Sequence, residues 1–297
     1  MTLADTRTED RYRTRTPHPL DPVERADPAV WGRVDGPLDP AALAAHDARG
    51  YSVFDTLLSP GEVRTYREEL SRLADHLRGD ERTIVEKSSA EVRSLFEVHK
   101  ISDLVAELVR DPRVLDRARQ VLGSEVYVHQ SRVNFMPGFK GKGFYWHSDF
   151  ETWHAEDGMP APRAVSMSIA LTDNYPFNGG LMVMPGSHRT FVPCVGETPE
   201  DHYRASLTEQ EIGVPSREHI TALAAAHGVD QFTGPAGSAL LFDSNLMHGS
   251  GNNITPFPRS NVFVVFNSVE NPLVEPFAAP APRPGFIAAR QFAPLTR

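Results

Sequence analysis

From Glu125 onward, several stretches of the chain carry apolar side chains at every second position, which is the period of a β-strand. In residues 165–172, for example, Val, Met, Ile and Leu alternate with Ser, Ala and Thr. Glycine, proline and asparagine separate such runs, as is usual between short strands. We expect strands at 126–129, 165–172, 181–184, 238–242 and 261–269.

Helix signals dominate the first third. Three stretches open with a capping Asp or Ser followed by proline and close at a glycine. They predict helices over 40–45, 60–79 and 112–123, with a short strand at 51–54 and a later helix at 216–226. Because the helices precede most strands and do not alternate with them, we expect a mainly β fold with flanking helices. Its core would be a double-stranded β-helix (jelly roll or cupin-like) and not a parallel sheet.

The domain organisation follows from composition along the chain. Residues 1–38 are polar and proline-bearing without periodicity, and predict an extended N-terminal arm. Residues 39–297 predict a single jelly-roll domain with an insertion at about 187–234. The proline-rich tail from Pro272 is expected to wrap the surface.

Net charge and cysteine content limit the classes of binding partner and the cellular location that we expect. A net charge of −9 argues against nucleic acid and anionic membranes. No apolar run has the roughly 18 residues that span a membrane, and the first residues lack the apolar stretch of a signal peptide. The single cysteine, Cys194, fits a reducing compartment, so a cytoplasmic location is expected. The sequence does not fix the oligomeric state and admits a homodimer.

His147-Ser148-Asp149 and the distant His248 form the most informative pattern. Residues i and i+2 of a strand share a face, so His147 and Asp149 are expected to bind one metal ion from a strand. With His248 from a neighbouring strand they would form the two-histidine, one-carboxylate triad of ferrous oxygenases. A solvated turn with a helix cap is the simpler alternative. The aromatic run 144–146 before His147 and the apolar strand before His248 favour the metal site.

Arg259 lies eleven residues after His248 and suggests that a negatively charged cosubstrate binds beside the metal ion. A dicarboxylate that chelates iron at one end needs a buried cation for the other, and the planar guanidinium of arginine suits a carboxylate. Ser250 shares a strand face with His248 and can donate to the same carboxylate. An ordinary surface arginine is the alternative reading.

These motifs, together with Asn178-Gly179-Gly180-Leu181 and Pro185-Gly186-Ser187-His188, resemble the phytanoyl-CoA hydroxylase group of iron(II)/2-oxoglutarate oxygenases. The stretch from Phe144 through Pro160, continued to Tyr175, is similar to the signature of the ectoine hydroxylases. The resemblance covers roughly residues 40–290. It implies hydroxylation of ectoine to 5-hydroxyectoine with release of succinate and carbon dioxide, with O2 as a further cosubstrate.

The resemblance also implies a set of site residues. Iron(II) would be bound by His147, Asp149 and His248. The 2-oxoglutarate would contact Arg259, Ser250, Asn134, Phe96 and Phe144. Ectoine would contact Gln130, Thr152, Trp153 and Arg283, with Phe242 and Phe266 as apolar walls.

Met136 departs from the family pattern, in which a lysine usually stands at this position and helps to hold 2-oxoglutarate. Methionine supplies no charge, which leaves Arg259 as the cation and puts cosubstrate affinity in question. Lys140 and Lys142 are candidates to compensate.

The residues are also compatible with three other functions, to different degrees. The nearest is a related hydroxylase acting on another small amino-acid-like solute such as proline. A zinc hydrolase is less compatible, because zinc sites favour three histidines or cysteine and hydrolysis does not need Arg259. A non-catalytic cupin-like module would bind ectoine without any need for 2-oxoglutarate.

Overall fold

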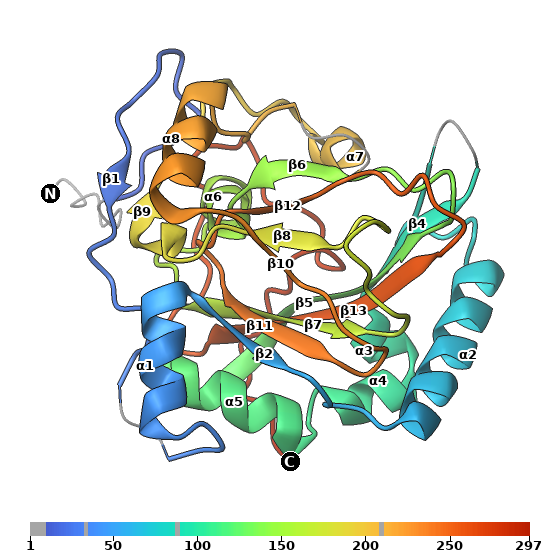
Figure 1. Cartoon of the computed structure of the whole chain (residues 1–297). Helices are drawn as coiled ribbons and strands as arrows, with labels where there is room; N and C mark the ends of the chain where they lie inside the picture. The colour runs from blue at the N-terminus through green and yellow to red at the C-terminus, as the bar shows by residue number, and fades with distance from the viewer. Residues whose placement is uncertain (1–9, 33–34, 87–89, 208–210) are drawn as a thin grey trace, which may run out of the picture.

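Two β-sheets pack face to face at the centre of the molecule (Figure 1). The computed structural model describes residues 10–32, 35–86, 90–207 and 211–297. The larger sheet has the strand order β2-β11-β7-β13-β5-β4-β3, and the smaller sheet has the order β10-β8-β12-β6. Adjacent strands in both sheets are antiparallel. This is the jelly-roll core that the sequence predicts.

The strands of the larger sheet are β2 (Tyr51–Phe54), β3 (Thr83–Val85), β4 (Val92–Phe96), β5 (Val126–Met136), β7 (Ala164–Ala170), β11 (Ala239–Asp243) and β13 (Arg259–Ser268). Those of the smaller sheet are β6 (Phe144–His147), β8 (Leu181–Val183), β10 (Asp230–Gln231) and β12 (His248–Ser250). A separate pair joins β1 (Val23–Glu24) to β9 (Thr190–Phe191).

The helices are α1 (Pro40–Arg49), α2 (Pro60–His76), α3 (Val98–Ile101), α4 (Asp103–Leu108), α5 (Pro112–Leu122), α6 (Asp149–Thr152), α7 (Tyr203–Ser206) and α8 (Arg217–His227). A π-helical turn, Trp153–Asp157, continues α6, and a 3-10 turn spans Ser187–Arg189. None of the helices in the described ranges is both long and apolar enough to cross a membrane.

The main core lies between the larger sheet and helices α2, α4 and α5. Leu70, Leu108 and Leu115 project from the helices onto Val133 and Ile169 of the sheet, and all are essentially inaccessible to solvent. Burial of this apolar surface provides most of the favourable free energy of folding. A smaller core, with Leu181 from one sheet and Phe263 from the other, fills the space between the two sheets.

The predicted helix starts are confirmed at residue level. Asp39, Ser59 and Ser216 each accept a hydrogen bond from the first turn of the helix that follows, and Ser59 and Glu62 form a reciprocal capping box. The prediction of a helical first third is incomplete, because the hairpin of β3 and β4 also lies there. It extends the larger sheet beside β5.

The segment before the main domain lies against the body along its described part. Tyr12 and Thr14 are buried, and Arg25 forms a buried ion pair with Asp243 of β11 at 2.8 Å. Residues 1–9 of the predicted arm and 208–210 of the predicted insertion lie outside the described residues.

The C-terminal tail was expected on the surface, and this is wrong for part of it. Ile287 and Ala288 are fully buried, and Ala289 donates a backbone hydrogen bond to His129 of β5. The tail therefore contributes to the interior beside β5.

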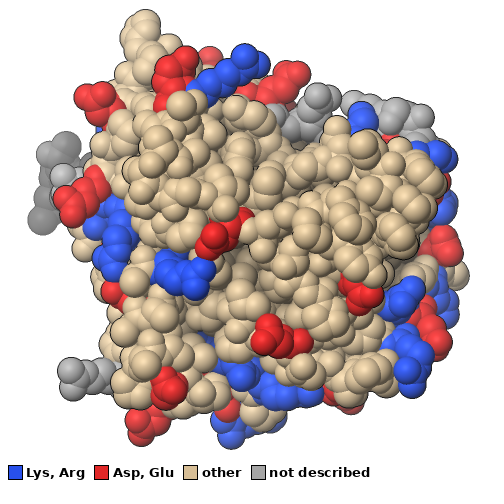
Figure 2. Space-filling view, viewed as in Figure 1, with Lys and Arg blue, Asp and Glu red and all other residues tan. Residues whose placement is uncertain are grey.

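Charged side chains of both signs are interspersed over the face shown in Figure 2, and they are sparse near its centre. This distribution fits the modest net charge of −9 on 297 residues.

Candidate active site

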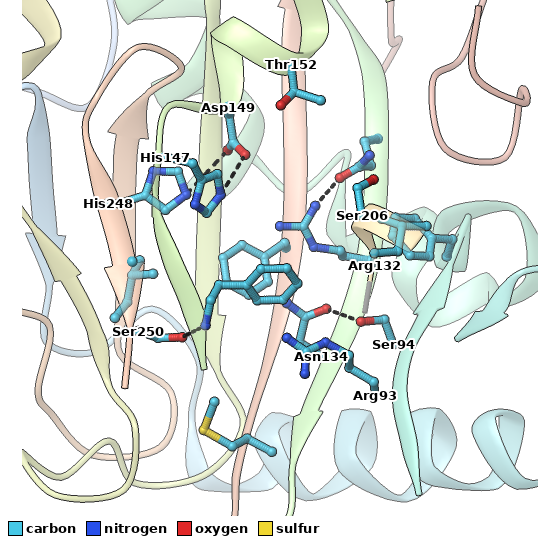
Figure 3. Close-up of a pocket in the computed structure, with 18 of the residues that line it drawn as sticks. Arg93, Ser94, Arg132, Asn134, His147, Asp149, Thr152, Ser206, His248 and Ser250 are labelled. Atoms are coloured by element: carbon cyan, nitrogen blue, oxygen red, sulfur yellow. Dashed lines mark hydrogen bonds and ion pairs between the residues drawn. The ribbon is translucent and has the colours of Figure 1, made fainter. Parts of the chain in front are cut away.

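Three potential metal ligands converge at the edge of the smaller sheet, facing the larger one (Figure 3). His147 Nε2 lies 3.8 Å from Asp149 Oδ1, and His248 Nε2 lies 3.9 Å from Asp149 Oδ2. Donor atoms of the three side chains lie within 4.8 Å of one another. Metal–donor bonds of about 2 Å allow one ion to contact all three. Elsewhere in the described part of the chain no other group of three such residues is found.

Strand pairing brings the two histidines together although 101 positions separate them. His248 of β12 is the direct partner of His147 of β6 in the antiparallel ladder. A side chain at Gly249 would place its Cβ 3.2 Å from the carbonyl oxygen of Phe144, so glycine permits this close approach.

Asp149 is not on the strand, and the same-face argument for His147 and Asp149 is wrong in this respect. Strand β6 ends at His147, and Asp149 is the first residue of α6. Its carboxylate faces the histidines because the chain turns from strand into helix at Ser148. His147 and Asp149 therefore face the same site because of a strand-to-helix turn between them, and not because they share a strand face.

Both histidines are oriented for metal binding through Nε2. The Nδ1 atoms of His147 and His248 lie 2.7 and 2.9 Å from the carbonyl oxygens of Tyr145 and Leu246. A carbonyl only accepts, so each Nδ1 carries a proton and donates, which leaves Nε2 as the nitrogen that can bind a metal ion. Metal-binding histidines are commonly fixed by such a bond from the second ring nitrogen.

The protonation states also suit a cation. Burial, with His248 nearby, lowers the pKa of His147 to about 4, so its imidazole is neutral near pH 7. Burial by itself raises the pKa of the Asp149 carboxyl, but His248, His147, Arg132 and a hydrogen bond from Ser166 together hold that pKa below its usual range. A neutral imidazole at His147 and an ionised carboxylate at Asp149 are the forms that bind iron.

A cavity extends from the triad between the two sheets. It brings together every residue implied by the resemblance except Phe242 and Phe266. Figure 3 shows Thr152 above Asp149, Arg132 beside the triad, and Ser250, Asn134 and Arg93 farther below. The remaining predicted residues on its wall are Phe96, Gln130, Phe144, Trp153, Arg259 and Arg283.

One end of the cavity holds a buried cation that has no carboxylate partner in the part of the chain that the structure describes. Arg259 is 8% exposed, and within the described residues its guanidinium meets only Asn261 Oδ1 at 3.4 Å and Met136 Sδ at 3.7 Å. Burial, with Arg93 nearby, lowers the pKa of Arg259 to about 10. A buried charge is costly unless it is paired, so this end of the cavity favours an anion.

Two polar residues beside Arg259 add hydrogen-bonding capacity. Ser250 Oγ accepts from the backbone nitrogen of Phe144 at 3.1 Å, which leaves its hydroxyl hydrogen to donate. Asn134 Oδ1 accepts from Ser94 Oγ at 2.8 Å, which leaves its amide hydrogens. These groups suit a carboxylate ligand.

The opposite end combines an aromatic face with a paired arginine. Arg283 donates through Nε and Nη2 to both oxygens of Asp157 at 2.8 and 2.6 Å, which leaves Nη1 for another acceptor. Gln130 donates to the carbonyl oxygen of Ile287 at 2.8 Å. Trp153 is 2% exposed and lies on the π-helical turn directly after Thr152.

The two phenylalanines predicted as apolar walls lie elsewhere. Alternate residues of β13 face opposite sides of the larger sheet, and Phe266 faces the helices in the main core, whereas Phe263 lines the cavity. Phe242 lies behind His248, with ring centroids 5.1 Å apart, and supports that ligand. Phe263, which the sequence analysis did not single out, is therefore the phenylalanine of β13 on the cavity wall.

Arg132 is a further residue that was missed. Gln130, Arg132, Asn134 and Met136 follow at every second position of β5, and all line the cavity. The period of two applied from Gln130 and Asn134 would have identified it. The Arg132 guanidinium contacts Gln130 Oε1 and lies 5.0 Å from the Phe263 ring centroid.

Comparison with known proteins shows which family the chain belongs to. Residues 47–261 match the phytanoyl-CoA dioxygenase (PhyH) family model. Ectoine dioxygenase of Nocardia farcinica is 69% identical over 96% of this chain and 95% of its own. The chain belongs to the ectoine dioxygenase branch of the phytanoyl-CoA dioxygenase family. The Halomonas elongata ectoine dioxygenase is 53% identical over 94% of this chain and 86% of its own.

Solved ectoine dioxygenase structures from S. alaskensis have the same fold. One with bound Fe superposes with a TM-score of 0.84 at 43% identity, covering 96% of each chain. One with 2-oxoglutarate and 5-hydroxyectoine has a TM-score of 0.82 at 44% identity, covering 95% of each. The fold alone is shared with the carbocyclase SnoK, at a TM-score of 0.60 and 19% identity.

Met136 lies against the guanidinium that the cosubstrate would need. Its sulfur occupies the cavity wall beside Arg259 and adds no charge there. Of the two lysines considered for compensation, Lys142 lines the cavity, whereas Lys140 is exposed and pairs with Glu91 at 3.6 Å. Arg93 also lines this end, paired with Glu86.

Proposed function

We propose that this protein is an iron(II)- and 2-oxoglutarate-dependent dioxygenase that hydroxylates ectoine to 5-hydroxyectoine. The observation that carries this function is a two-histidine, one-carboxylate triad in the same cavity as the buried Arg259, which has no carboxylate partner among the described residues. Zinc hydrolysis gives no role to that arginine. The relatives named ectoine dioxygenases, one of them solved with 2-oxoglutarate and 5-hydroxyectoine, support the assignment.

His147, Asp149 and His248 fit iron(II), and would hold it by one face. Iron bound in this way, with 2-oxoglutarate and O2, supplies the oxidation that converts a C–H bond to C–OH and yields succinate and carbon dioxide. The chain fixes both imidazoles through backbone carbonyls and keeps the carboxylate ionised. Burial between the sheets excludes water from the reacting atoms.

Arg259 would bind the distal carboxylate of 2-oxoglutarate, assisted by Ser250 and Asn134. A guanidinium presents parallel N–H donors that match a carboxylate. Phe96 and Phe144 line the same region, and Phe144 also lies against Arg93, whose guanidinium carbon is 4.1 Å from the ring centroid.

Ectoine would occupy the end of the cavity nearer α6. Its carboxylate would meet Arg283, its amidine edge Gln130 and Thr152, and its delocalised cation the Trp153 ring. Phe263 supplies apolar wall in place of Phe266. Because Asp157 neutralises Arg283, this end can accept a zwitterion with little net charge change.

Substrate competition tests the assignment. Purified protein reconstituted with iron(II) receives equimolar ectoine and L-proline with 2-oxoglutarate, and products are identified by NMR. We expect 5-hydroxyectoine to predominate, with equimolar succinate. Predominant hydroxyproline would instead indicate the related amino-acid hydroxylase, and ectoine binding without any turnover would indicate the non-catalytic module.

A homodimer and a cytoplasmic location stay predictions. Exposed apolar residues at Phe139, Phe177, Ile254 and Phe257 offer surface for a second copy, and the Phe177 and Phe257 ring centroids lie 6.0 Å apart. Light scattering coupled to size-exclusion chromatography measures the mass directly, and a value near 33 kDa would exclude the dimer.

A further inference from the structure

The segment Asp149–Asp157 carries more buried charge than the reaction uses. It supplies the metal ligand Asp149 and the cavity residues Thr152 and Trp153. It also carries Glu151 and Glu156, which are 1% and 2% exposed and lie outside the cavity. Two buried carboxylates on one short segment need a cation close by.

The cation comes from the N-terminal arm. Arg15 donates to Glu151 through Nε at 2.7 Å and Nη2 at 2.9 Å, and Nη2 also lies 3.2 Å from Glu156 Oε1. Thr14 adds a hydrogen bond to Glu151 Oε1 at 2.6 Å. A single guanidinium therefore joins both glutamates, about 140 positions away in sequence.

The backbone of the arm is fixed at this point. Arg15 adopts a φ of 55°, and its nitrogen donates to the carbonyl oxygen of Cys194 at 2.9 Å. Cys194 in turn donates through its backbone nitrogen to Thr14 Oγ1 at 2.9 Å. A non-glycine residue keeps a left-handed conformation only where its surroundings enforce it.

The same cluster reaches the segment that closes another side of the cavity. His202, the residue directly before α7, places its Nδ1 2.9 Å from Glu156 Oε1. Ser206 at the end of α7 and Leu207 after it line the cavity. A Cβ on Gly213 would lie 2.1 Å from Arg15 Nη2, so the chain beyond α7 also packs against this guanidinium.

We propose that Arg15 is a positioning residue for ectoine hydroxylation. It acts by fixing the segment Asp149–Asp157 against the arm and α7, which holds Thr152 and Trp153 in place for the substrate. This role rests on the proposed function. Arg15 does not line the active-site cavity and contacts none of its metal or cosubstrate residues.

The test replaces Arg15 with lysine, which keeps the charge and loses the planar fork. KM and kcat are measured for ectoine and for 2-oxoglutarate, with 5-hydroxyectoine formed per succinate released. We expect KM for ectoine to rise about tenfold, since small misplacements of binding groups have effects of this order or larger. KM for 2-oxoglutarate should change less than about twofold, and the product ratio should fall below one.

Two further variants and one measurement without turnover keep the test decisive. Thr14→Val removes one bond to Glu151 and should act in the same direction if Arg15→Lys does not fold. Arg11→Lys is the matched control, because Arg11 lies on the same arm but pairs with the arm residue Asp27. Hydrogen exchange should be faster in residues 149–157 and 203–207 of the Arg15 or Thr14 variant, and unchanged in β7.

The outcomes separate the two proposals. Wild-type protein that does not hydroxylate ectoine contradicts the proposed function. The positioning role is contradicted if the wild-type protein is active and Arg15→Lys leaves KM for ectoine, the product ratio and hydrogen exchange unchanged. If Arg15→Lys does not fold, the same results in Thr14→Val contradict it. Equal changes in the KM for ectoine and for 2-oxoglutarate would also overturn it.

Discussion

Replacing Arg259 with methionine removes a buried charge whose only close polar contacts within the described residues are neutral. Burial, together with the nearby Arg93, lowers the pKa of Arg259 from its ordinary value to about 10. At 1.36 kcal/mol per pKa unit this corresponds to about 3 kcal/mol of unfavourable free energy near pH 7. A bound carboxylate relieves that cost, so the loss of Arg259 should weaken 2-oxoglutarate binding by a similar amount.

The expected result is a rise of about 100-fold in KM for 2-oxoglutarate, which is what about 3 kcal/mol represents. KM for ectoine should change less than about twofold, because Arg259 lies at the other end of the cavity. The ligand-free variant should melt at the same temperature as wild type or higher, since no carboxylate among the described residues loses a partner.

Arg283→Met is the matched comparison. Arg283 is also buried, but it pairs with the fully buried Asp157. Its removal leaves that carboxylate with His129, whose Nε2 lies 3.3 Å from Asp157 Oδ2, as its remaining ionisable partner. Breaking a buried ion pair costs up to about 3–5 kcal/mol, so the melting temperature should fall. KM for ectoine should rise more than KM for 2-oxoglutarate. Equal effects of Arg259→Met on both KM values, or a destabilisation like that of Arg283→Met, would refute this reasoning.

Two other predictions concern the triad and acid stability. His248→Ala should abolish iron(II) retention, measured by elemental analysis after desalting, while the circular dichroism spectrum stays native; iron at wild-type stoichiometry would show that another residue is the ligand. Burial lowers the pKa of His46 from 6.5 to about 4, so the unfolded chain takes up a proton first and stability should fall as pH drops from about 6.5 to 4. The full loss of unfolding free energy is about 3 kcal/mol. Urea unfolding of His46→Gln, whose side chain cannot titrate, should show a weaker dependence of the unfolding free energy on pH. An unchanged pH dependence would assign the loss of stability in acid to other groups.

Local signals in the sequence predicted much of the fold, because helix caps and strand alternation act over a few residues. Asp39, Ser59 and Ser216 begin helices as their chemistry requires. The hairpin of β3 and β4 was missed because β4 pairs with the distant β5, which no local pattern shows, and the short β3 pairs only with β4. The buried part of the tail was missed for the same reason.

The candidate site shows the same division. Residue types and order pointed to His147, Asp149, His248 and Arg259, which the structure brings to one cavity. Phe266 was misplaced because its face depends on the register of β13 in the sheet. The Asp157 partner of Arg283, and the contact between Arg15 and Glu151, join distant segments and could not be read from spacing.

The most direct test of the account is metal-dependent turnover by protein stripped of metal. Iron(II) added anaerobically, followed by ectoine, 2-oxoglutarate and air, should restore activity and give one 5-hydroxyectoine for each succinate. Zinc(II) should not restore it, and omission of 2-oxoglutarate should abolish it. Turnover with zinc, or without 2-oxoglutarate, would contradict an iron site formed by His147, Asp149 and His248.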